Sequence, residues 1–132
     1  MKISTKGRYA LRMMLDLAEH SGAGFVRLRE IAERQQISDK YLEQITSQLV
    51  KAGFIKGVRG SQGGYKLSKS PSQYTIGSIL RVTEGSLAPV ACLDDPVNTC
   101  SRAADCPTLK LWKGLDNLIS NYLDGKTLKD LM

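Results

Sequence analysis

The chain has 132 residues, a net charge of +6 at pH 7 and a hydrophobic content of 42%. That content can form the core of one domain, while no apolar run approaches the ~20 residues that cross a bilayer. The first residues, MKIS, lead into a charged segment and lack a signal-peptide pattern. We therefore expect a cytoplasmic protein that makes no membrane contact. Three cysteines in such a compartment argue against a disulfide framework.

Positive charge is concentrated in the first half of the chain. Residues 1–70 contain 13 Lys and Arg against 6 Asp and Glu, whereas residues 71–132 contain 6 against 7. A polyanion bound by the first half would explain this asymmetry. A soluble domain with an uneven surface charge would explain it equally well, so the charge alone leaves both interpretations open.

The first predicted element is a helix over residues 5–20, which Ser4 or Thr5 can cap. Its apolar residues recur at helical spacing and predict a buried stripe: Tyr9, Ala10, Met13, Met14, Leu17 and Ala18. The basic residues near its start form either a phosphate-facing patch or an ordinary solvated face; they are Lys2, Lys6, Arg8 and Arg12. His20 near the helix end suits the helix dipole, with metal ligation as the alternative.

Residues 28–65 have the plan of a winged helix-turn-helix. A short helix that carries Leu28, Ile31 and Ala32 on one face is followed by a polar break at residues 35–36. Ser38 is a good N-cap for the helix that comes next. Two short helices joined in this way are typical of DNA-binding domains.

The second of these helices has two distinct faces. Tyr41, Leu42, Ile45 and Leu49 recur at helical spacing and should face the core. The opposite face carries Asp39, Lys40, Glu43, Gln44, Ser47 and Gln48. Side chains of these types read base edges, because Gln pairs with adenine, Glu accepts from cytosine, and Lys contacts guanine or phosphate.

A glycine-rich hairpin follows. Gly53 is expected to end the preceding helix in a left-handed conformation, and residues 54–55 and 65–67 are predicted as two short strands. The loop between them is tipped by Arg59 and contains Gly57, Gly60, Gly63 and Gly64. Such a loop is long and flexible enough to project as a wing.

The segment after the wing contains all three cysteines. Thr75 is predicted to cap a helix that ends near residues 84–85. Residues 86–107 then lack any helical or strand period and hold Cys92, Cys100 and Cys106. An irregular segment of this length is usually functional or disordered.

A long helix is predicted over residues 108–123, with Pro107 in its first turn. Its apolar face is too wide for a helix that lies alone on a small domain, and comprises Leu111, Trp112, Leu115, Leu118, Ile119, Tyr122 and Leu123. Pairing with the same helix of a second chain explains this face. Packing onto the first helix of the same chain is the alternative. Gly125 ends the helix, and Thr127 is expected to cap a last short turn.

Several segments resemble the IscR-type (Rrf2) family of bacterial transcriptional regulators. They are STKGRYA near the start, ERQQIS and YLEQ in the helix-turn-helix, VRGSQGGY in the wing, and the three cysteines ahead of LW in the last helix. The resemblance covers almost the whole chain. It implies a mainly α-helical winged helix-turn-helix with a two-stranded wing, a homodimer formed through the long C-terminal helix, and binding to palindromic promoter DNA. Residues 1–85 would be the DNA-binding domain, residues 86–107 a cluster-binding loop, and residues 108–132 the dimerisation helix and C-terminal turn.

The resemblance also implies roles for single residues. By position, Glu43 and Gln44 should meet base edges, Ser38 and Tyr41 should hold phosphates, and Arg59–Gly60 match the family's minor-groove finger. An arginine enters a narrow minor groove because the negative potential is enhanced there, with an exposed hairpin arginine as the alternative. The best-known relatives carry a small polar residue in place of Lys40, which leaves the operator sequence open. The expected DNA-binding residues are Ser38, Lys40, Tyr41, Glu43, Gln44, Ser47, Arg59 and Gly60.

The three cysteines, Cys92, Cys100 and Cys106, match the family's ligand triplet and imply an iron–sulfur cluster, either 2Fe–2S or 4Fe–4S. Their spacing alone fits a zinc site or free buried cysteines equally well. The fourth ligand departs from the family, because Leu109 stands in place of a histidine and Arg8 in place of the acidic residue of the family's nitric oxide sensor. The remaining candidates are Asp94, Asp95 or Asp105, an acidic residue or His20 of a second chain, or an exchangeable water or thiol.

The sequence therefore predicts a DNA-binding transcriptional regulator whose operator affinity or choice is set by an iron–sulfur cluster. One alternative is a cluster-free regulator of the same family that responds to thiol oxidation or to a partner protein. Another is a constitutive DNA-binding protein with a zinc site. An enzyme with a small-molecule substrate is not expected, because the chain has a single His, no Cys–His or Ser–His–Asp pattern, and no Lys–Ser/Thr after the glycines of residues 57–64.

Overall fold

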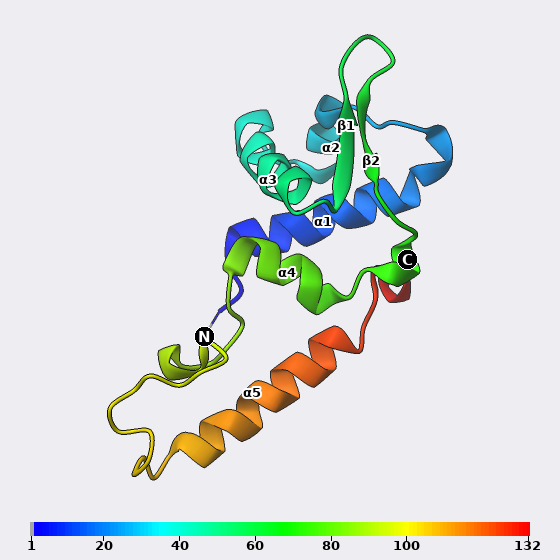
Figure 1. Ribbon diagram of the computed structural model, residues 1–132. Coiled ribbons are helices and arrows are strands. Elements are labelled where there is room, and N and C mark those ends of the chain that lie inside the picture. Colours follow the sequence, from blue (N-terminus) through cyan, green and yellow to red (C-terminus); the bar gives the residue numbers. More distant parts are fainter. Residues whose placement is uncertain (1) are drawn as a thin grey trace.

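The computed structural model describes residues 2–132 and is mainly helical (Figure 1). Helix α1 (Thr5–Glu19) lies at the centre and contacts α2 (Leu28–Gln35), α3 (Asp39–Lys51), α4 (Ile76–Glu84) and strand β2 (Gly64–Leu67). Strand β2 pairs with β1 (Ile55–Val58) in a two-stranded antiparallel sheet. The predicted fold class, a mainly α-helical winged helix-turn-helix, is confirmed.

The core forms where α1 meets the helix-turn-helix and α4. The side chains of Met13 and Met14 are fully buried, as the apolar stripe predicts, whereas Tyr9 is only half-buried. The helix-turn-helix and β1 contribute Ile31, Ala32, Ile37, Leu42, Ile45, Leu49 and Ile55. Removing this apolar surface from water is the main stabilising contribution, at about 25 cal/mol per Å².

The turn between α2 and α3 is short and tightly specified. Gln36 takes a left-handed conformation, with φ at 54°, and its N–H bonds to the Ala32 carbonyl to end α2. Ile37 is buried beneath the turn. Ser38 then caps α3, because its Oγ accepts a hydrogen bond from the Tyr41 N–H at 3.2 Å. The predicted cap is confirmed.

Replacing Gln36 by Gly should raise the free energy of unfolding by about 1 kcal/mol, because a left-handed residue with a Cβ carries a cost of that order. Within residues 2–132, Gln36 is the only non-glycine residue with a positive φ. Chemical denaturation of the two proteins measures the change. Gln36→Ala keeps the Cβ and serves as the control, which should show no gain. Equal stability of the Gly and Ala variants would contradict the expectation.

The wing is longer than predicted. Strand β1 runs from Ile55 to Val58 and pairs with β2 in the register Ile55↔Leu67, Lys56↔Lys66, Gly57↔Tyr65 and Val58↔Gly64. Gly57, predicted as a loop residue, lies inside β1, where it pairs with Tyr65 across the sheet, and the Tyr65 ring occupies the place of a side chain at residue 57. A Cβ at Gly57 would stand 2.8 Å from Tyr65 Cε1. Tyr65 also bridges to Val26 through backbone hydrogen bonds of 2.7 and 2.8 Å, which joins the wing to the residues ahead of α2.

Helix α5 (Leu109–Asp124) projects below the winged unit, packs against α4, and is linked to it by an irregular segment (Figure 1). Three short 3-10 turns, η1 (Ser21–Ala23), η2 (Pro71–Gln73) and η3 (Ala91–Leu93), lie in the connections. Pro107 precedes the helix instead of occupying its first turn, because the Leu109 N–H bonds to the Cys106 carbonyl at 3.4 Å and forms a turn there. Among the described residues, no helix is both long and apolar enough to cross a membrane.

The end of the chain returns to the core. After α5, the turn η4 (Leu128–Leu131) places Leu128 in a fully buried position. The Leu128 N–H donates to the Tyr74 carbonyl at 2.9 Å, and the Ile76 N–H donates to the Lys126 carbonyl at 2.8 Å. Thr127 is the N-cap of η4, as predicted, and it forms a capping box with Asp130. Both ends of α5 are therefore attached to the winged unit, one through a long loop and the other through a tight connection.

Candidate DNA-reading face and cysteine loop

Helix α3 presents a polar face to solvent. Glu43 and Gln44 are exposed there, with Lys40 and Ser47 beside them. The opposite face is anchored by Leu42, Ile45 and Leu49, all at 0% exposure. Core packing therefore sets the rotation of α3 and directs these polar side chains outward. An exposed carboxylate such as Glu43 disfavours a polyanion unless a cytosine amino group donates to it, so it selects by penalty as well as by attraction.

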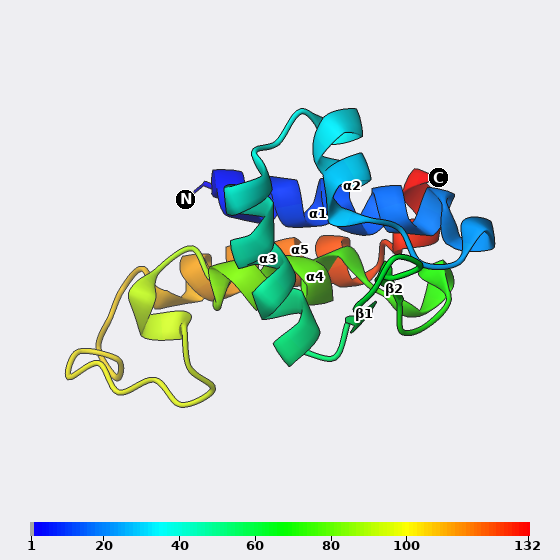
Figure 2. The same cartoon turned by 90° about the horizontal axis from the view of Figure 1, so that it is seen from above.

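The face of α3 does not stand alone. Seen from above, α3 crosses α1 and α4 (Figure 2), and α2, α3 and the wing all lie on the side of α1 away from α5 (Figure 1). Lys6 of α1 lines a shallow hollow together with Lys40, Gln44 and Ser47 of α3. Of the basic residues near the start of α1, Lys6 thus lies beside the face that holds the predicted base-reading residues.

The side chain of Tyr41 packs partly against the domain and is partly exposed to solvent. Its ring is half-buried and packs edge-on against Tyr9, with the ring centroids 5.6 Å apart. The Arg12 guanidinium lies over the other ring, 5.1 Å from the Tyr9 centroid. Tyr41 therefore packs against the core, as its helical spacing predicts, while part of it stays accessible to a ligand. Ser38 is exposed next to it, and its Oγ is engaged in the α3 cap.

The wing presents Arg59 and Gly60 at its tip. Both are exposed, and Gly60 has a φ of 110°, a conformation that favours glycine. The wing is tied back to the body of the domain, since the Arg27 guanidinium donates to the Ser61 carbonyl. This contact limits the positions that the tip can take relative to α2.

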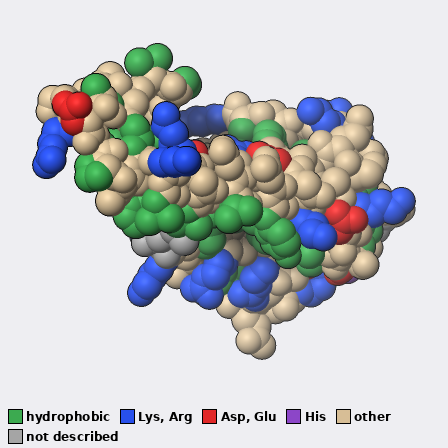
Figure 3. All heavy atoms as spheres, turned by 90° about the horizontal axis from the view of Figure 1, so that it is seen from below, with side chains coloured by type: hydrophobic (Ala, Val, Ile, Leu, Met, Phe, Trp, Pro, Cys, Tyr) green, Lys and Arg blue, Asp and Glu red, His purple; other side chains and the backbone are tan. Residues whose placement is uncertain are grey.

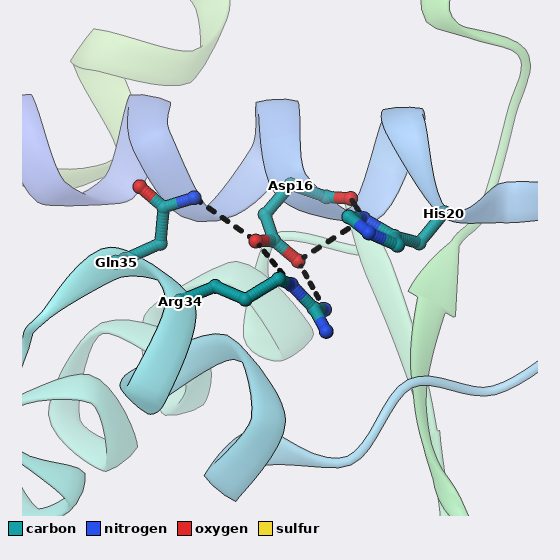
Figure 4. A network of polar contacts seen from close by, with 4 residues as sticks. All are labelled: Asp16, His20, Arg34 and Gln35. Atoms are coloured by element: carbon teal, nitrogen blue, oxygen red, sulfur yellow. Dashed lines mark hydrogen bonds and ion pairs between the residues drawn. The ribbon is translucent and has the colours of Figure 1, made fainter.

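A buried ionic network under the helix-turn-helix was not foreseen from the sequence (Figure 4). Asp16 of α1 is 1% exposed. Its Oδ1 accepts from Arg34 Nη2 at 2.7 Å, and its Oδ2 accepts from Arg34 Nε at 3.0 Å and from Gln35 Nε2 at 2.9 Å. His20 Nδ1 lies 3.6 Å from Oδ1 and 2.8 Å from the Asp16 carbonyl oxygen. The available signal was a carboxylate inside the apolar stripe of α1, which requires a buried partner.

The pKa of Asp16 reflects this network. Burial raises the pKa of the carboxyl, but the hydrogen bonds from Arg34 and Gln35 outweigh burial and hold it below its ordinary value. The folded state therefore binds a proton less readily than the unfolded state. The network contributes stability above the ordinary Asp pKa of about 3.9 and loses that contribution as the pH falls below it.

Asp16→Asn should therefore lower the free energy of unfolding at pH 7 by about 3 kcal/mol, the scale for breaking a buried ion pair. The difference from the unsubstituted chain should shrink as the pH falls below about 4, because the unfolded state takes up the proton first, and the loss is complete once the pH is below the lowered pKa of folded Asp16. Denaturant titrations between pH 3 and 7 measure this. Glu19→Gln, an exposed acid on the same helix, is the control. A gap that stays constant with pH would contradict the expectation.

The three predicted cluster ligands are free thiols on the irregular segment between α4 and α5. Cys100 is exposed, whereas Cys92 and Cys106 are half-buried. Cys106 Sγ lies 3.5 Å from Thr108 Oγ1. That hydroxyl, together with the backbone N–H groups of Thr108 and Leu109, lowers the pKa of the Cys106 thiol. Three thiols are the donor type that iron–sulfur clusters require.

The thiols are not gathered in this arrangement. Across residues 2–132, no three Cys, His, Asp or Glu side chains stand close enough to share one metal ion. The donor chemistry thus fits a thiolate-bound group, and the segment must rearrange to bring the donors together. Apart from η3 it has no regular secondary structure that opposes such a change.

The residues considered as a fourth ligand lie on different elements of the fold. Leu109 begins α5 and is half-buried, and exposed Arg8 donates to Thr5 Oγ1 at 3.0 Å. His20 is held at the end of α1 by Asp16, which matches its interpretation as a helix C-terminal histidine. Asp94, Asp95 and Asp105 are exposed on the cysteine segment itself.

Helix α5 leaves an apolar stripe uncovered. Leu111, Leu118 and Tyr122 are 63%, 69% and 66% exposed. Figure 3, which looks onto this side of the molecule, shows apolar side chains gathered in a band across it. Because these side chains are exposed, packing onto the first helix of the same chain, the predicted alternative, does not cover them.

Comparison with known proteins decides the family. A family model named Rrf2 and described as an iron-dependent transcriptional regulator matches residues 3–132. The chain belongs to the Rrf2 family of transcriptional regulators. Rrf2 regulators bind DNA and are not enzymes, so the prediction of a DNA-binding, non-catalytic regulator is confirmed.

Two groups of Rrf2 relatives are similar to this chain to the same degree. CymR of Bacillus subtilis, described as the global cysteine regulator of that organism, is 41% identical over 99% of this chain and 89% of its own. Its structure aligns with a TM-score of 0.80. IscR of Aliivibrio salmonicida is 42% identical over the whole of this chain and 77% of its own. The structure of IscR from T. potens, at 42% identity, aligns with a TM-score of 0.79 over 99% of this chain and 85% of its own.

Proposed function

We propose that this Rrf2 regulator binds palindromic promoter DNA as a homodimer and that an iron–sulfur cluster held by Cys92, Cys100 and Cys106 sets its operator affinity or operator choice. The observation that carries the proposal is the placement of three free thiols on one irregular segment between the winged unit and α5. When bound, such a cluster adds a redox-active and labile group to that segment.

The proposed DNA contacts follow the exposed faces. Glu43 and Gln44, with Lys40 and Ser47 beside them, would enter the major groove, and Arg59–Gly60 would enter the adjacent minor groove. Phosphates would be held by Ser38 and Tyr41. A dimer of such domains needs its two reading helices about 34 Å apart, one turn of DNA.

The cysteine segment is well placed to influence that spacing. It is one of the two connections between α5 and the winged unit, and the other, through η4, is tight. Ordering of the segment would therefore restrict how the winged units sit on a pair of α5 helices. The shift in operator affinity is limited by the difference in binding free energy between the two arrangements.

A second candidate is a cluster-free regulator that responds to thiol oxidation. Two observations favour it: Cys100 is exposed, and within residues 2–132 the three thiols are not gathered around one metal position. The 41% identity to a relative described as a cysteine regulator is consistent with a cysteine-linked signal.

Anaerobic purification followed by an absorbance spectrum and iron, sulfide and zinc analysis tests the proposal. We expect a coloured protein with matched iron and sulfide, and a colourless, folded dimer when all three cysteines are replaced by Ala. The operator is first selected from a random duplex library, and its affinity is then compared with and without the chromophore. A protein that stays colourless after reconstitution would favour thiol oxidation, or a zinc site if it contains zinc, and would overturn the cluster proposal.

A further inference from the structure

We infer that four residues, Asp16, Arg34, Gln35 and Arg12, position α3 for base reading and are not merely a stabilising ionic contact. We call them the Asp16 network. The inference rests on the proposed DNA contacts of α3. It identifies the residues that fix the orientation of α3 relative to α1.

The first half of the network holds the end of α2. The Asp16 carboxylate accepts two hydrogen bonds from the Arg34 guanidinium, in a bidentate arrangement, and a third from Gln35 (Figure 4). Gln35 is the last residue of α2, and only residues 36–38 separate it from α3. Because Gln36 is already confined to one left-handed conformation, holding Gln35 in place also determines where α3 begins.

A second set of contacts, made by Arg12, connects the network to the first turn of α3. Arg12, one turn before Asp16 on α1, donates to Gln35 Oε1 at 3.2 Å and to the Gln35 carbonyl oxygen. The same guanidinium lies over the Tyr9 ring, which packs edge-on against Tyr41. A continuous series of contacts therefore runs from the buried carboxylate to a residue of α3 that we propose to contact phosphate.

Directional contacts of this kind do what the apolar core cannot do alone. Apolar packing is non-directional, and buried ion pairs replaced by apolar residues of similar volume often cost no stability. Base reading, however, needs side chains placed to about 0.5 Å and 10–20°. A carboxylate with both oxygens engaged by two α2 side chains specifies the angle between α1 and α2, and so the orientation of α3.

The test separates placement from stability. The double variant Asp16→Leu/Arg34→Met replaces the ion pair with apolar side chains and leaves the net charge unchanged. Arg29→Met/Glu33→Leu is its matched control, because that pair, 3.5 Å apart, is on the exposed face of the same helix. Affinity is measured for the selected operator and for a scrambled duplex of equal length, alongside the free energy of unfolding.

We expect the Asp16/Arg34 variant to lose about 10-fold or more of its preference for the operator, with its affinity for the scrambled duplex unchanged. The control should keep the full preference. A folded Asp16/Arg34 variant with unchanged preference would overturn the inference.

Arg12→Lys supplies an independent test, because it keeps the charge at an exposed position and removes the contacts to Gln35. It should lower the operator preference several-fold without changing the salt dependence of binding. If the Asp16/Arg34 variant does not fold, an unchanged preference in Arg12→Lys overturns the inference. If the unsubstituted chain binds the selected operator no more tightly than the scrambled duplex, the proposed function is refuted instead.

Discussion

Leu118→Asp should convert the proposed α5 dimer into a monomer and lower operator affinity by about 100-fold or more, because binding through two linked half-sites gains roughly 10²–10⁴ over binding through one. Leu118 is 69% exposed in the middle of the α5 stripe, between Leu111 and Tyr122. In a symmetric helix pair each copy would bring a carboxylate into an apolar contact, where an unpaired charge is costly.

Sedimentation or light scattering measures the oligomeric state, and fluorescence anisotropy with a labelled operator measures affinity. Asn117→Asp is the matched control, since it adds the same charge to an exposed residue just outside the stripe. It should remain dimeric and bind normally. A Leu118→Asp protein that is still dimeric would remove α5 as the dimer contact.

Arg59→Ala should weaken operator binding by 10-fold to 100-fold, about 1–3 kcal/mol. An arginine in a narrow minor groove is attracted by the enhanced potential there, and Arg59 is exposed at the wing tip next to a glycine that allows close approach. Arg59→Lys should recover little of the loss, because a lysine is more strongly hydrated and lacks the planar guanidinium.

Competition binding against operator and scrambled duplexes provides the measurement. Lys69→Ala removes the same charge from an exposed residue beyond the end of the wing and should have little effect. If Arg59→Ala and Lys69→Ala lose the same small amount of affinity for both duplexes, Arg59 acts only through its charge, as an exposed hairpin arginine.

The predicted helices and the predicted caps at Ser38 and Thr127 agree with the structure because they depend on residues a few positions apart. The apolar stripe of α1 and the two faces of α3 follow from helical spacing in the same way. The wing was located correctly but predicted too short. Gly57 is a poor strand residue by itself, and its place in β1 depends on pairing with Tyr65, eight residues away, whose ring leaves no room for a side chain at residue 57.

The sequence by itself determined the helix-turn-helix, the wing and the location of the cysteines, since local periodicity, capping and turn chemistry encode them. It also determined, through the family motifs, that the chain is a DNA-binding regulator. Only the tertiary structure revealed the pairing of Asp16 with Arg34 and Gln35, 18 and 19 residues along the chain. The same is true of the return of Leu128 to the core, the uncovered stripe of α5 and the separation of the thiols. Each of these is set by contacts between distant segments, which depend on how the helices pack and not on any local pattern.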